Sequence, residues 1–378
     1  YNVVFERSAR FLETLDEDGD PCENLESLRL SVFDSLHEVF RRTEFEVKAI
    51  NFTSYGASFV YLNKEGRPIT ALYNYLKAYP EDLQHNLYAQ YGGEDAFCLA
   101  TASPALGSLN SGLQLYRMKK QKPEVFAEIE YALHLPQYLS YLISGKAYSD
   151  MTSIGCHTAL WDYPSHAYHP WVKDEKLDRL LAPLVKGTDA FEATFPGSNY
   201  LVGAGLHDSS AALIPYLLNF HEPFILISTG TWCISFNPFN HRALSAAELQ
   251  QDCLFYLTHS GTPVKASRLF AGQEHEVQSK RIADYFAVTA AKFRNLQIDW
   301  DVVATLREKF VFEGAALSSF GERDIAGFTS YSEAYHCLIL DLVQAQLYAT
   351  GLVMGDQKMS RIFVDGGFGK NAIYMNLI

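Results

Sequence analysis

Hydrophobic residues along this chain change from helical spacing to short strand-like runs and back. Six residues between positions 24 and 42 fall on one stripe and predict an amphipathic helix: Leu25, Leu28, Val32, Leu36, Val39 and Phe40. Apolar runs at 47–52 and 59–62 predict strands, and residues 1–8 alternate enough to predict another. Residues 76–145 read mostly as helices, with Pro136 as a break or restart. The first half therefore predicts strands followed by helices.

The second half predicts the same order again. A strand at 202–206, a helix at 211–218 and a strand at 224–227 come first. A long helix at 331–354, a strand at 360–364 and a further helix follow. No repeat is visible by residue identity, but the architecture repeats. The 378 residues fit two domains of about 150–200 residues each, and we expect an α/β protein with domains at 1–199 and 200–378.

Composition narrows the class of protein. Hydrophobic residues make up 48% and charged residues 20%, as in soluble globular proteins. The net charge of −13 argues against a nucleic-acid-binding surface, which needs clustered Lys and Arg. No run of about eighteen apolar residues predicts a membrane span, and no signal peptide is visible at the start. The six cysteines form no C-x-x-C pair, so we expect buried free thiols and a cytoplasmic location.

Two other clusters resemble metal sites only loosely. The acidic segment 16–21, DEDGDP, lacks the spacing of a calcium loop, and we expect a solvated loop. His157, His166 and His169 lack paired spacing and a matching acidic or cysteine ligand, which favours surface histidines over zinc ligands. The metal ligands of this chain thus stay unknown from its sequence.

The residues that are candidates for a chemical role are concentrated at 201–235. Asp208 follows a short strand and stands at or next to a helix start, where Asp accepts hydrogen bonds from unpaired backbone N–H groups. About twenty residues later, the hydroxyl-rich turn 228–231 (STGT) follows a second strand. Active sites collect after strands in sheets flanked by helices. Taken singly, Asp208 as a helix cap and 228–231 as a hairpin turn remain open alternatives.

A third turn, 365–371 (DGGFGKN), links the strand at 360–364 to a helix. Its glycines allow the backbone to approach a ligand closely. The G-x-x-x-x-G-K-[ST] spacing of a P-loop is absent, and from the residues alone a structural turn remains the alternative.

Together and in this order, the three sites resemble the FGGY family of carbohydrate kinases. GLHDSSAAL resembles the segment with the catalytic aspartate, STGTW the second phosphate motif and FVDGGFGKN the adenosine motif. In the first half, TSYGASFVYLNKEGRPI with Tyr73-Asn74-Tyr75 resembles the sugar-side segment, and SDMTSIGCHTALWD is similar to the family's D-x-S-x-A-S-x-T-x-L-x-D region. The resemblance covers nearly the whole chain. It is greatest to rhamnulokinase-like and L-fuculokinase-like members.

The resemblance implies the actin-like ATPase fold, with two ribonuclease-H-like domains around a central cleft. It implies ATP-dependent phosphorylation of a hydroxyl of a ketose, such as rhamnulose, fuculose or xylulose, with Mg²⁺ as a cofactor. The expected partners are a small-molecule sugar and ATP, without nucleic acid or membrane. Since relatives often dimerise, a homodimer is a further expectation.

The resemblance also assigns roles to residues. Asp208 would be the general base that accepts the proton of the sugar hydroxyl. The nucleotide would contact Thr229, Gly230 and Thr231 through its phosphates, Gly272 nearby, and Gly366, Gly367 and Asn371 through its adenosine. The sugar pocket would be lined by Gly56, Ala57, Tyr73, Asn74, His207 and Asp208.

Two departures from the family pattern affect these expectations. The first phosphate motif, a D-x-G-[TK]-[TSN] hairpin, is absent; we expect it to precede Tyr1, and the last helices to follow Ile378. Many relatives place an aspartate where Asn74 stands, followed by an arginine, so the sugar stays open. The alternative is a non-catalytic sugar- or nucleotide-binding relative. An actin-like ATPase of chaperone type is disfavoured by the sugar-side segment.

Overall fold

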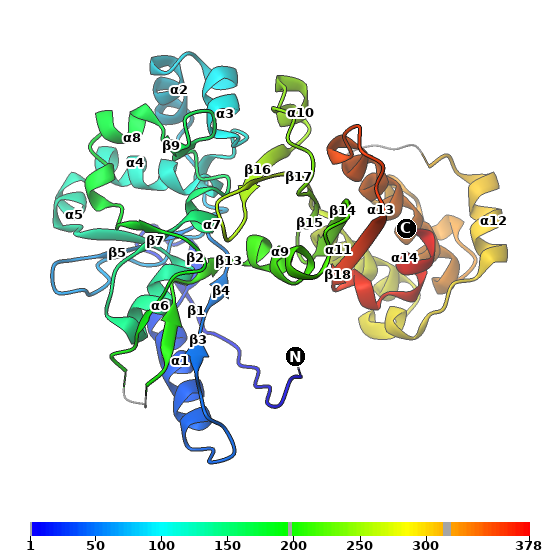
Figure 1. Ribbon diagram of the computed structural model, residues 1–378. Coiled ribbons are helices and arrows are strands. Elements are labelled where there is room, and N and C mark those ends of the chain that lie inside the picture. The colour runs from blue at the N-terminus through cyan, green and yellow to red at the C-terminus, as the bar shows by residue number, and fades with distance from the viewer. Residues whose placement is uncertain (1, 196–198, 313–318) are drawn as a thin grey trace. The chain divides into compact units, whose positions relative to one another are not determined.

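The computed structural model describes residues 2–195, 199–312 and 319–378, which divide into two units (Figure 1). The first unit comprises Tyr1–Ile214 and Phe255–Pro263, and the second comprises Pro215–Leu254 and Val264–Ile378. The first unit thus extends to Ile214, whereas the sequence suggested a boundary after residue 199. The physical reason is strand pairing, because two strands within 201–207 pair with strands near position 50.

In the first unit, short parallel strand pairs bring residues 49–54 next to residues 201–207. β3 (Ala49–Ile50) pairs in parallel with β12 (Leu201–Gly203), and β4 (Thr53–Ser54) pairs in parallel with β13 (Leu206–His207). Other pairs in this unit join β11 (Ala190–Glu192) to β12, β5 (Phe59–Leu62) to β6 (Tyr131–His134), β7 (Ser149–Asp150) to β10 (Leu184–Val185), and β8 (Trp161–Asp162) to β9 (Ala167–Tyr168). Because β4 and β13 are parallel, the residues after both strands lie at one edge.

Helices surround these strands. They are α1 (Leu25–Phe40), α2 (Glu81–Gln90), α3 (Glu94–Thr101), α4 (Ser111–Gln121), α5 (Pro123–Glu128), α6 (Leu135–Ser144), α7 (Met151–Ile154) and α8 (Pro170–Asp174). The stripe that predicted α1 is confirmed, and Asn24 caps it by accepting the Ser27 N–H at 2.9 Å. Pro136 occupies the first turn of α6, where it removes no helical hydrogen bond. Gly145 ends that helix with φ of 64°.

Two predictions about elements are wrong. Residues 2–8 form no strand, because they have no partner strand, and Val3 and Val4 are 82% and 75% exposed. Tyr1 lies outside the described residues. The first strand is instead β1 (Glu13–Leu15), which pairs with β2 (Pro21–Glu23). The apolar run Tyr131–His134 forms β6 within the stretch expected to be helical, because β5 offers it an antiparallel partner.

The acidic loop between β1 and β2 is also not simply solvated. The Lys77 Nζ lies 2.6 Å from Asp16 Oδ2, 2.6 Å from Asp18 Oδ2 and 3.0 Å from Asp20 Oδ2. The Asp16 side chain is fully buried, and that of Lys77 is 8% exposed. Burial opposes ionisation of Asp16, yet hydrogen bonds from Lys77 and the loop backbone lower its pKa. An internal ammonium group therefore organises this loop.

A five-stranded sheet with strand order β16-β17-β15-β14-β18 contributes the strands of the second unit, although residues 255–257 of β16 are assigned to the first unit. β14 (Phe224–Thr229) pairs antiparallel with β15 (Cys233–Asn237) and parallel with β18 (Arg361–Gly366), as Figure 1 shows. The other strands are β16 (Cys253–Leu257) and β17 (Pro263–Leu269). The helices are α9 (Asp208–Asn219), which crosses from the first unit, α10 (Ala246–Gln250), α11 (Ala271–Tyr285), α12 (Trp300–Lys309), α13 (Tyr331–Val353) and α14 (Ala372–Leu377).

The core of the second unit is built on α13. By length and composition this helix could cross a membrane, but 72% of its most apolar window is buried inside the protein. It contacts α11, α12, α14 and β15. Among its side chains Leu338 and Ile339 are fully buried. The helix therefore behaves as the core helix of this unit.

The cysteines are buried as predicted, whereas two of the three histidines predicted to lie at the surface are buried. All six cysteines are free and buried, which confirms the prediction. The prediction of surface histidines is wrong for His157 and His169, each 7% exposed, and right for His166. Both buried rings pack against other aromatic rings, His157 against Tyr256 and His169 against Phe97.

Candidate functional site

Asp208 is the first residue of α9 and directly follows β13, as the sequence predicted. Its side chain is 52% exposed. The Oδ1 atom accepts the backbone N–H of Ser209 at 2.6 Å and its hydroxyl at 3.2 Å. Both bonds go to the adjacent residue, whereas an N-cap side chain accepts the N–H two or three residues ahead. Both also use Oδ1, which leaves Oδ2 to accept a proton.

His207, immediately before it, is 3% exposed and fixed from two directions. Its backbone N–H donates to Thr152 Oγ1 at 2.9 Å. Its Nε2 lies 3.3 Å from the Cys156 Sγ and 3.6 Å from Asp208 Oδ1. Burial lowers the pKa of His207, although the charge of Asp208 opposes that shift. Burial therefore favours the neutral form of the ring.

The turn after β4 lies at the same edge as His207. A Cβ at Gly56 would come within 2.8 Å of the His207 Cδ2 and 3.6 Å of the Ser153 Oγ, so only glycine fits there without displacing the ring. The carbonyl of the next residue, Ala57, accepts a hydrogen bond from Gln114 Nε2 at 2.7 Å. The structure thus brings the predicted residues Gly56 and His207 into contact across a parallel strand pair.

Tyr73 and Asn74, predicted for the same pocket, have other partners. The Tyr73 hydroxyl donates to Glu17, and Lys122 Nζ lies 3.3 Å from it. The Asn74 Nδ2 donates to the Pro21 carbonyl at 3.2 Å. The Asn74 Oδ1 accepts the Leu76 N–H at 2.9 Å. Within the described ranges, none of the hydrogen bonds given for these two side chains goes to the His207–Asp208 pair.

Other residues near Asp208 were missed by sequence reasoning. Burial raises the pKa of Tyr75, and the charge of Asp208 adds to the shift. Ser153 is fully buried, and its hydroxyl has no hydrogen-bond partner in the described structure. Tyr75 could have been chosen from its place in the Tyr73-Asn74-Tyr75 segment, but no spacing signal links Ser153 to Gly56.

In the second unit, the hairpin turn between β14 and β15 carries the exposed residues Gly230 and Thr231. A Cβ at Gly272, in the first turn of α11, would lie 1.9 Å from the Gly230 carbonyl oxygen. The start of α11 has no side-chain cap. The Gln273 N–H donates to the Thr231 carbonyl at 3.3 Å, so the turn and the helix start are joined. The helix dipole at the start of α11 favours an anion beside it.

Thr229 has a different position from its two neighbours in the motif. It is 4% exposed, its hydroxyl donates to the Asp365 carbonyl, and it accepts the Phe368 N–H at 3.0 Å. Its single hydroxyl proton is thus used within the protein. Thr229 joins β14 to the 365–371 turn, while a phosphate would meet the exposed Gly230 and Thr231.

The 365–371 turn, which begins at the end of β18, contacts Thr229 at the end of β14. Gly366 has φ of 84°, and a Cβ there would lie 2.0 Å from the Thr229 carbonyl oxygen, so the position requires glycine. The Gly367 N–H donates to that same oxygen at 2.9 Å. Both glycines are exposed. Three motifs spread over about 140 residues therefore converge at the ends of β14 and β18.

Asn371 serves as the N-cap of α14. Its Oδ1 accepts the N–H groups of Ile373 and Tyr374, both at 3.1 Å, and its Nδ2 donates to the Tyr335 hydroxyl at 2.8 Å. The same hydroxyl lies 2.7 Å from the His275 Nε2. Burial lowers the pKa of His275 to about 4, so this ring is also neutral.

Comparisons with known proteins find likeness to carbohydrate kinases. Residues 221–378 match the family model of the carbohydrate kinase FGGY C-terminal domain. A rhamnulokinase from Halalkalibacterium halodurans is 22% identical over 156 residues, a match that covers 40% of this chain and 33% of the relative. The match thus spans about a third of the length of that curated relative.

Solved structures extend the likeness to the rest of the chain. A carbohydrate kinase from Novosphingobium aromaticivorans is 23% identical with a TM-score of 0.72, covering 96% of this chain and 80% of that one. A Plasmodium falciparum glycerol kinase with ADP is 13% identical with a TM-score of 0.70, covering 100% and 79%. At these identities the likeness shows the fold. The predicted fold class, with two ribonuclease-H-like domains of the actin-like ATPase fold, is confirmed.

Proposed function

We propose that this protein phosphorylates a sugar hydroxyl with ATP, because residues 221–378 match the family model of the FGGY carbohydrate kinase C-terminal domain and the chain has the fold of solved carbohydrate kinases. The observation that carries the proposal is the pair of strand-end sites. One presents a half-exposed carboxylate, Asp208, beside the Gly56 turn. The other gathers exposed glycine turns and an uncapped helix start at the ends of β14 and β18.

In the proposed reaction, Asp208 Oδ2 accepts the proton of the sugar hydroxyl. The hydroxyl oxygen forms a bond to the γ-phosphorus of ATP, the bond from that phosphorus to the bridging oxygen breaks, and ADP leaves with the electron pair. His207 and Ser209 hold the carboxylate in position. The backbone around Gly230, Thr231 and Gly272 contacts the phosphates, and Gly366, Gly367 and Asn371 lie on the adenosine side.

Mg²⁺ belongs to the proposal as a partner of the ATP phosphates, whose charge it neutralises. The described residues bring together one group of three metal-ligating side chains, Cys156, His157 and His207. Sulfur and nitrogen donors do not suit Mg²⁺, which binds oxygen and usually keeps several waters beside one or two carboxylates and substrate phosphates. We therefore assign no protein ligand to Mg²⁺.

The sugar is proposed only as a class, a ketose of the rhamnulose, fuculose or xylulose kind. The rhamnulokinase relative supports this class, and the glycerol kinase neighbour shows that the fold also serves other polyols. The buried, free cysteines are consistent with the reducing cytoplasm. A homodimer is also proposed, and light scattering on the purified protein measures it.

Release of ADP by the full-length protein, over a panel of ketoses with glycerol and gluconate added, tests the proposal. We expect one ketose to stimulate ADP release well above the rate without acceptor. Asp208→Asn should lower turnover by roughly 10²–10⁴-fold and leave ADP affinity unchanged, because the loss is that of a positioned general base. The matched control is Asp34→Asn on the exposed surface of α1, which should retain full turnover.

Two outcomes would count against the kinase. Retention of sugar and nucleotide binding without turnover on any acceptor would favour the non-catalytic relative. Turnover of Asp208→Asn close to that of the unmodified protein would remove Asp208 from the role of base.

A further inference from the structure

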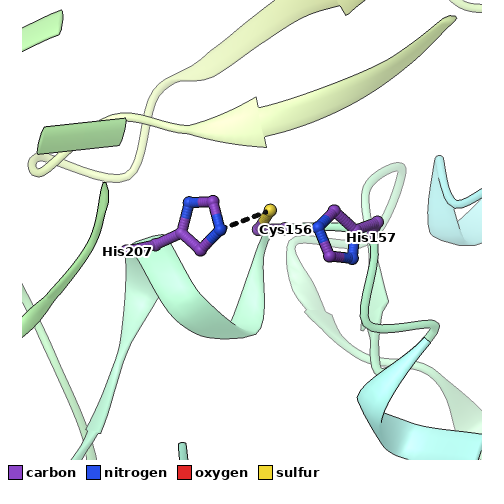
Figure 2. A group of neighbouring side chains, drawn as sticks. All are labelled: Cys156, His157 and His207. Carbon is purple, nitrogen blue, oxygen red and sulfur yellow. Dashed lines mark hydrogen bonds between the residues drawn. The ribbon is translucent and has the colours of Figure 1, made fainter. Parts of the chain in front are cut away.

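Three buried side chains with metal-binding atoms lie together in the first unit (Figure 2). They are Cys156, His157 and His207, which are 0%, 7% and 3% exposed. One ligand atom of each lies within 4.8 Å of the other two. Within the described part of the chain, this is the one group of three or more His, Cys, Asp or Glu side chains so close together.

The spacing of these atoms suits a tetrahedral ion. Zn–S bonds of about 2.3 Å and Zn–N bonds of about 2.0–2.1 Å at a tetrahedral angle separate sulfur and nitrogen by about 3.6 Å. The Cys156 Sγ and the His207 Nε2 are 3.3 Å apart. Figure 2 shows the two imidazole rings on opposite sides of the Cys156 sulfur. Small side-chain movements would place three donors around one ion.

The second nitrogen of His157 has a partner that suits metal binding. The His157 Nδ1 lies 3.1 Å from the Leu109 carbonyl oxygen and donates to it, which leaves the lone pair on Nε2. Metal-binding histidines commonly have such a backbone carbonyl on the second nitrogen.

Asp208 lies beside this cluster. Its Oδ1 is 3.6 Å from the His207 Nε2, and its side chain is 52% exposed. An ion bound to the His207 Nε2 would therefore be within reach of the Asp208 carboxylate, which would become a fourth ligand.

We propose that Cys156, His157 and His207 bind Zn²⁺, with loss of the Cys156 thiol proton, and that the bound ion inhibits phosphoryl transfer by engaging Asp208. A thiolate with two imidazoles selects a soft transition metal over Mg²⁺ or Ca²⁺. Binding of the ion stands independently, whereas the inhibition rests on the proposed function.

Binding is tested by titrating the purified protein with Co²⁺, whose thiolate charge-transfer and four-coordinate d–d absorption reports the ligands directly. We expect one Co²⁺ per chain, displaced by Zn²⁺. Cys156→Ser should abolish the charge-transfer band, and His157→Gln should weaken Co²⁺ binding at least tenfold. The matched controls are Cys98→Ser, another buried thiol, and His166→Gln, an exposed imidazole, which should both bind as the unmodified protein does.

Circular dichroism of each variant verifies its fold. If Cys156→Ser does not fold, the Co²⁺ affinity of His157→Gln tests the site in its place. Absence of the thiolate band in the unmodified protein, or the same band in Cys156→Ser, would overturn the site.

Inhibition is tested by ADP release at fixed Mg·ATP and increasing Zn²⁺. We expect His157→Gln, a variant outside the proposed sugar pocket, to keep its basal turnover and to need at least tenfold more Zn²⁺ for half inhibition. Equal Zn²⁺ sensitivity of both proteins would overturn the inhibitory role. If Co²⁺ binds as expected but no acceptor supports turnover, the metal site stands, while the proposed function and the inhibition that rests on it fail.

Discussion

The loop that presents Asp208 is held by buried polar side chains. Thr152 accepts the His207 backbone N–H through its hydroxyl oxygen and donates its own proton to Asp150. Asp150 is fully buried and also accepts the Thr152 backbone N–H at 2.8 Å. Burial raises the pKa of Asp150 to about 7, although these hydrogen bonds oppose the shift. Asp150, which Thr152 links to the His207 backbone N–H, thus has a pKa of about 7.

The stability of the first unit should therefore fall as pH rises from about 4 to about 7. In this range the folded protein holds a proton on Asp150 that the unfolded chain has lost, so unfolding becomes easier with rising pH. Asp150→Asn keeps an oxygen acceptor for Thr152 and cannot ionise. We expect the variant to gain about 2–3 kcal/mol of unfolding free energy relative to the unmodified protein between pH 5 and pH 8.

Urea unfolding at the two pH values measures this difference. In a background with Trp232 and Trp300 replaced by Phe, the fluorescence of Trp161 and Trp171 reports on the first unit. The exposed substitution Asp34→Asn serves as the control and should show no such pH dependence. An Asp150→Asn difference that is the same at pH 5 and pH 8 would contradict the raised pKa.

Long-range partners explain why several residues were misjudged from sequence. Asp208 at a helix start and the glycines of 365–371 could be identified because the signal lies within a few neighbouring residues. Cys156 and His207 are 51 positions apart, and Lys77 lies 61 positions from Asp16. Neither the metal-ligating cluster nor the ordered acidic loop has a local pattern, because each depends on residues that only the fold brings together.

Elements with a long, regular pattern were predicted well. α1 and α13 each present a sustained apolar pattern, and the isolated run Phe59–Leu62 is β5 with the predicted bounds. β6 was missed because a four-residue apolar run inside helical surroundings has no period of its own. Its identity depends on pairing with β5. The pairing of residues 201–207 with the strands near position 50 also explains why the first unit extends to Ile214.

Gly272 lies at the contact between α11 and the β14–β15 hairpin, where a larger residue should be harmful. A Cβ at Gly272 would lie 1.9 Å from the Gly230 and 2.9 Å from the Thr231 carbonyl oxygen, which are both backbone atoms. Gly272→Ala must displace the helix start, and we expect a loss of about 1–3 kcal/mol in stability and at least tenfold weaker ADP binding. Calorimetric titration with ADP and thermal unfolding measure both effects.

Gly351 in α13 is the matched control. A Cβ there meets nothing within 4 Å, and the position is exposed in a helix. Gly351→Ala should stabilise the protein by about 0.5–1 kcal/mol and leave ADP binding unchanged. If Gly272→Ala bound ADP as tightly as Gly351→Ala, the α11 start would have no part in the nucleotide site.

The molecule as a whole combines two units that each have their own core. In the first unit Leu28, Val60 and Leu133 belong to one cluster, and in the second unit Leu338 and Phe368 belong to another. The predicted sugar-side residues all belong to the first unit, and the nucleotide-side residues all belong to the second. Each ligand alone should consequently stabilise its own unit, because a ligand that binds only the folded form stabilises what it contacts.

Hydrogen exchange with single ligands tests this division. ADP alone should slow exchange at 229–231, 271–274 and 366–371, where the backbone itself forms the proposed phosphate and adenosine contacts. An accepted ketose alone should slow exchange at 53–57 and 207–209. Gly272→Ala should lose the protection by ADP and keep the protection by the ketose. Protection of the second unit by the ketose alone would contradict the assignment of the sugar to Gly56, His207 and Asp208, because the ligand would then bind away from the proposed base.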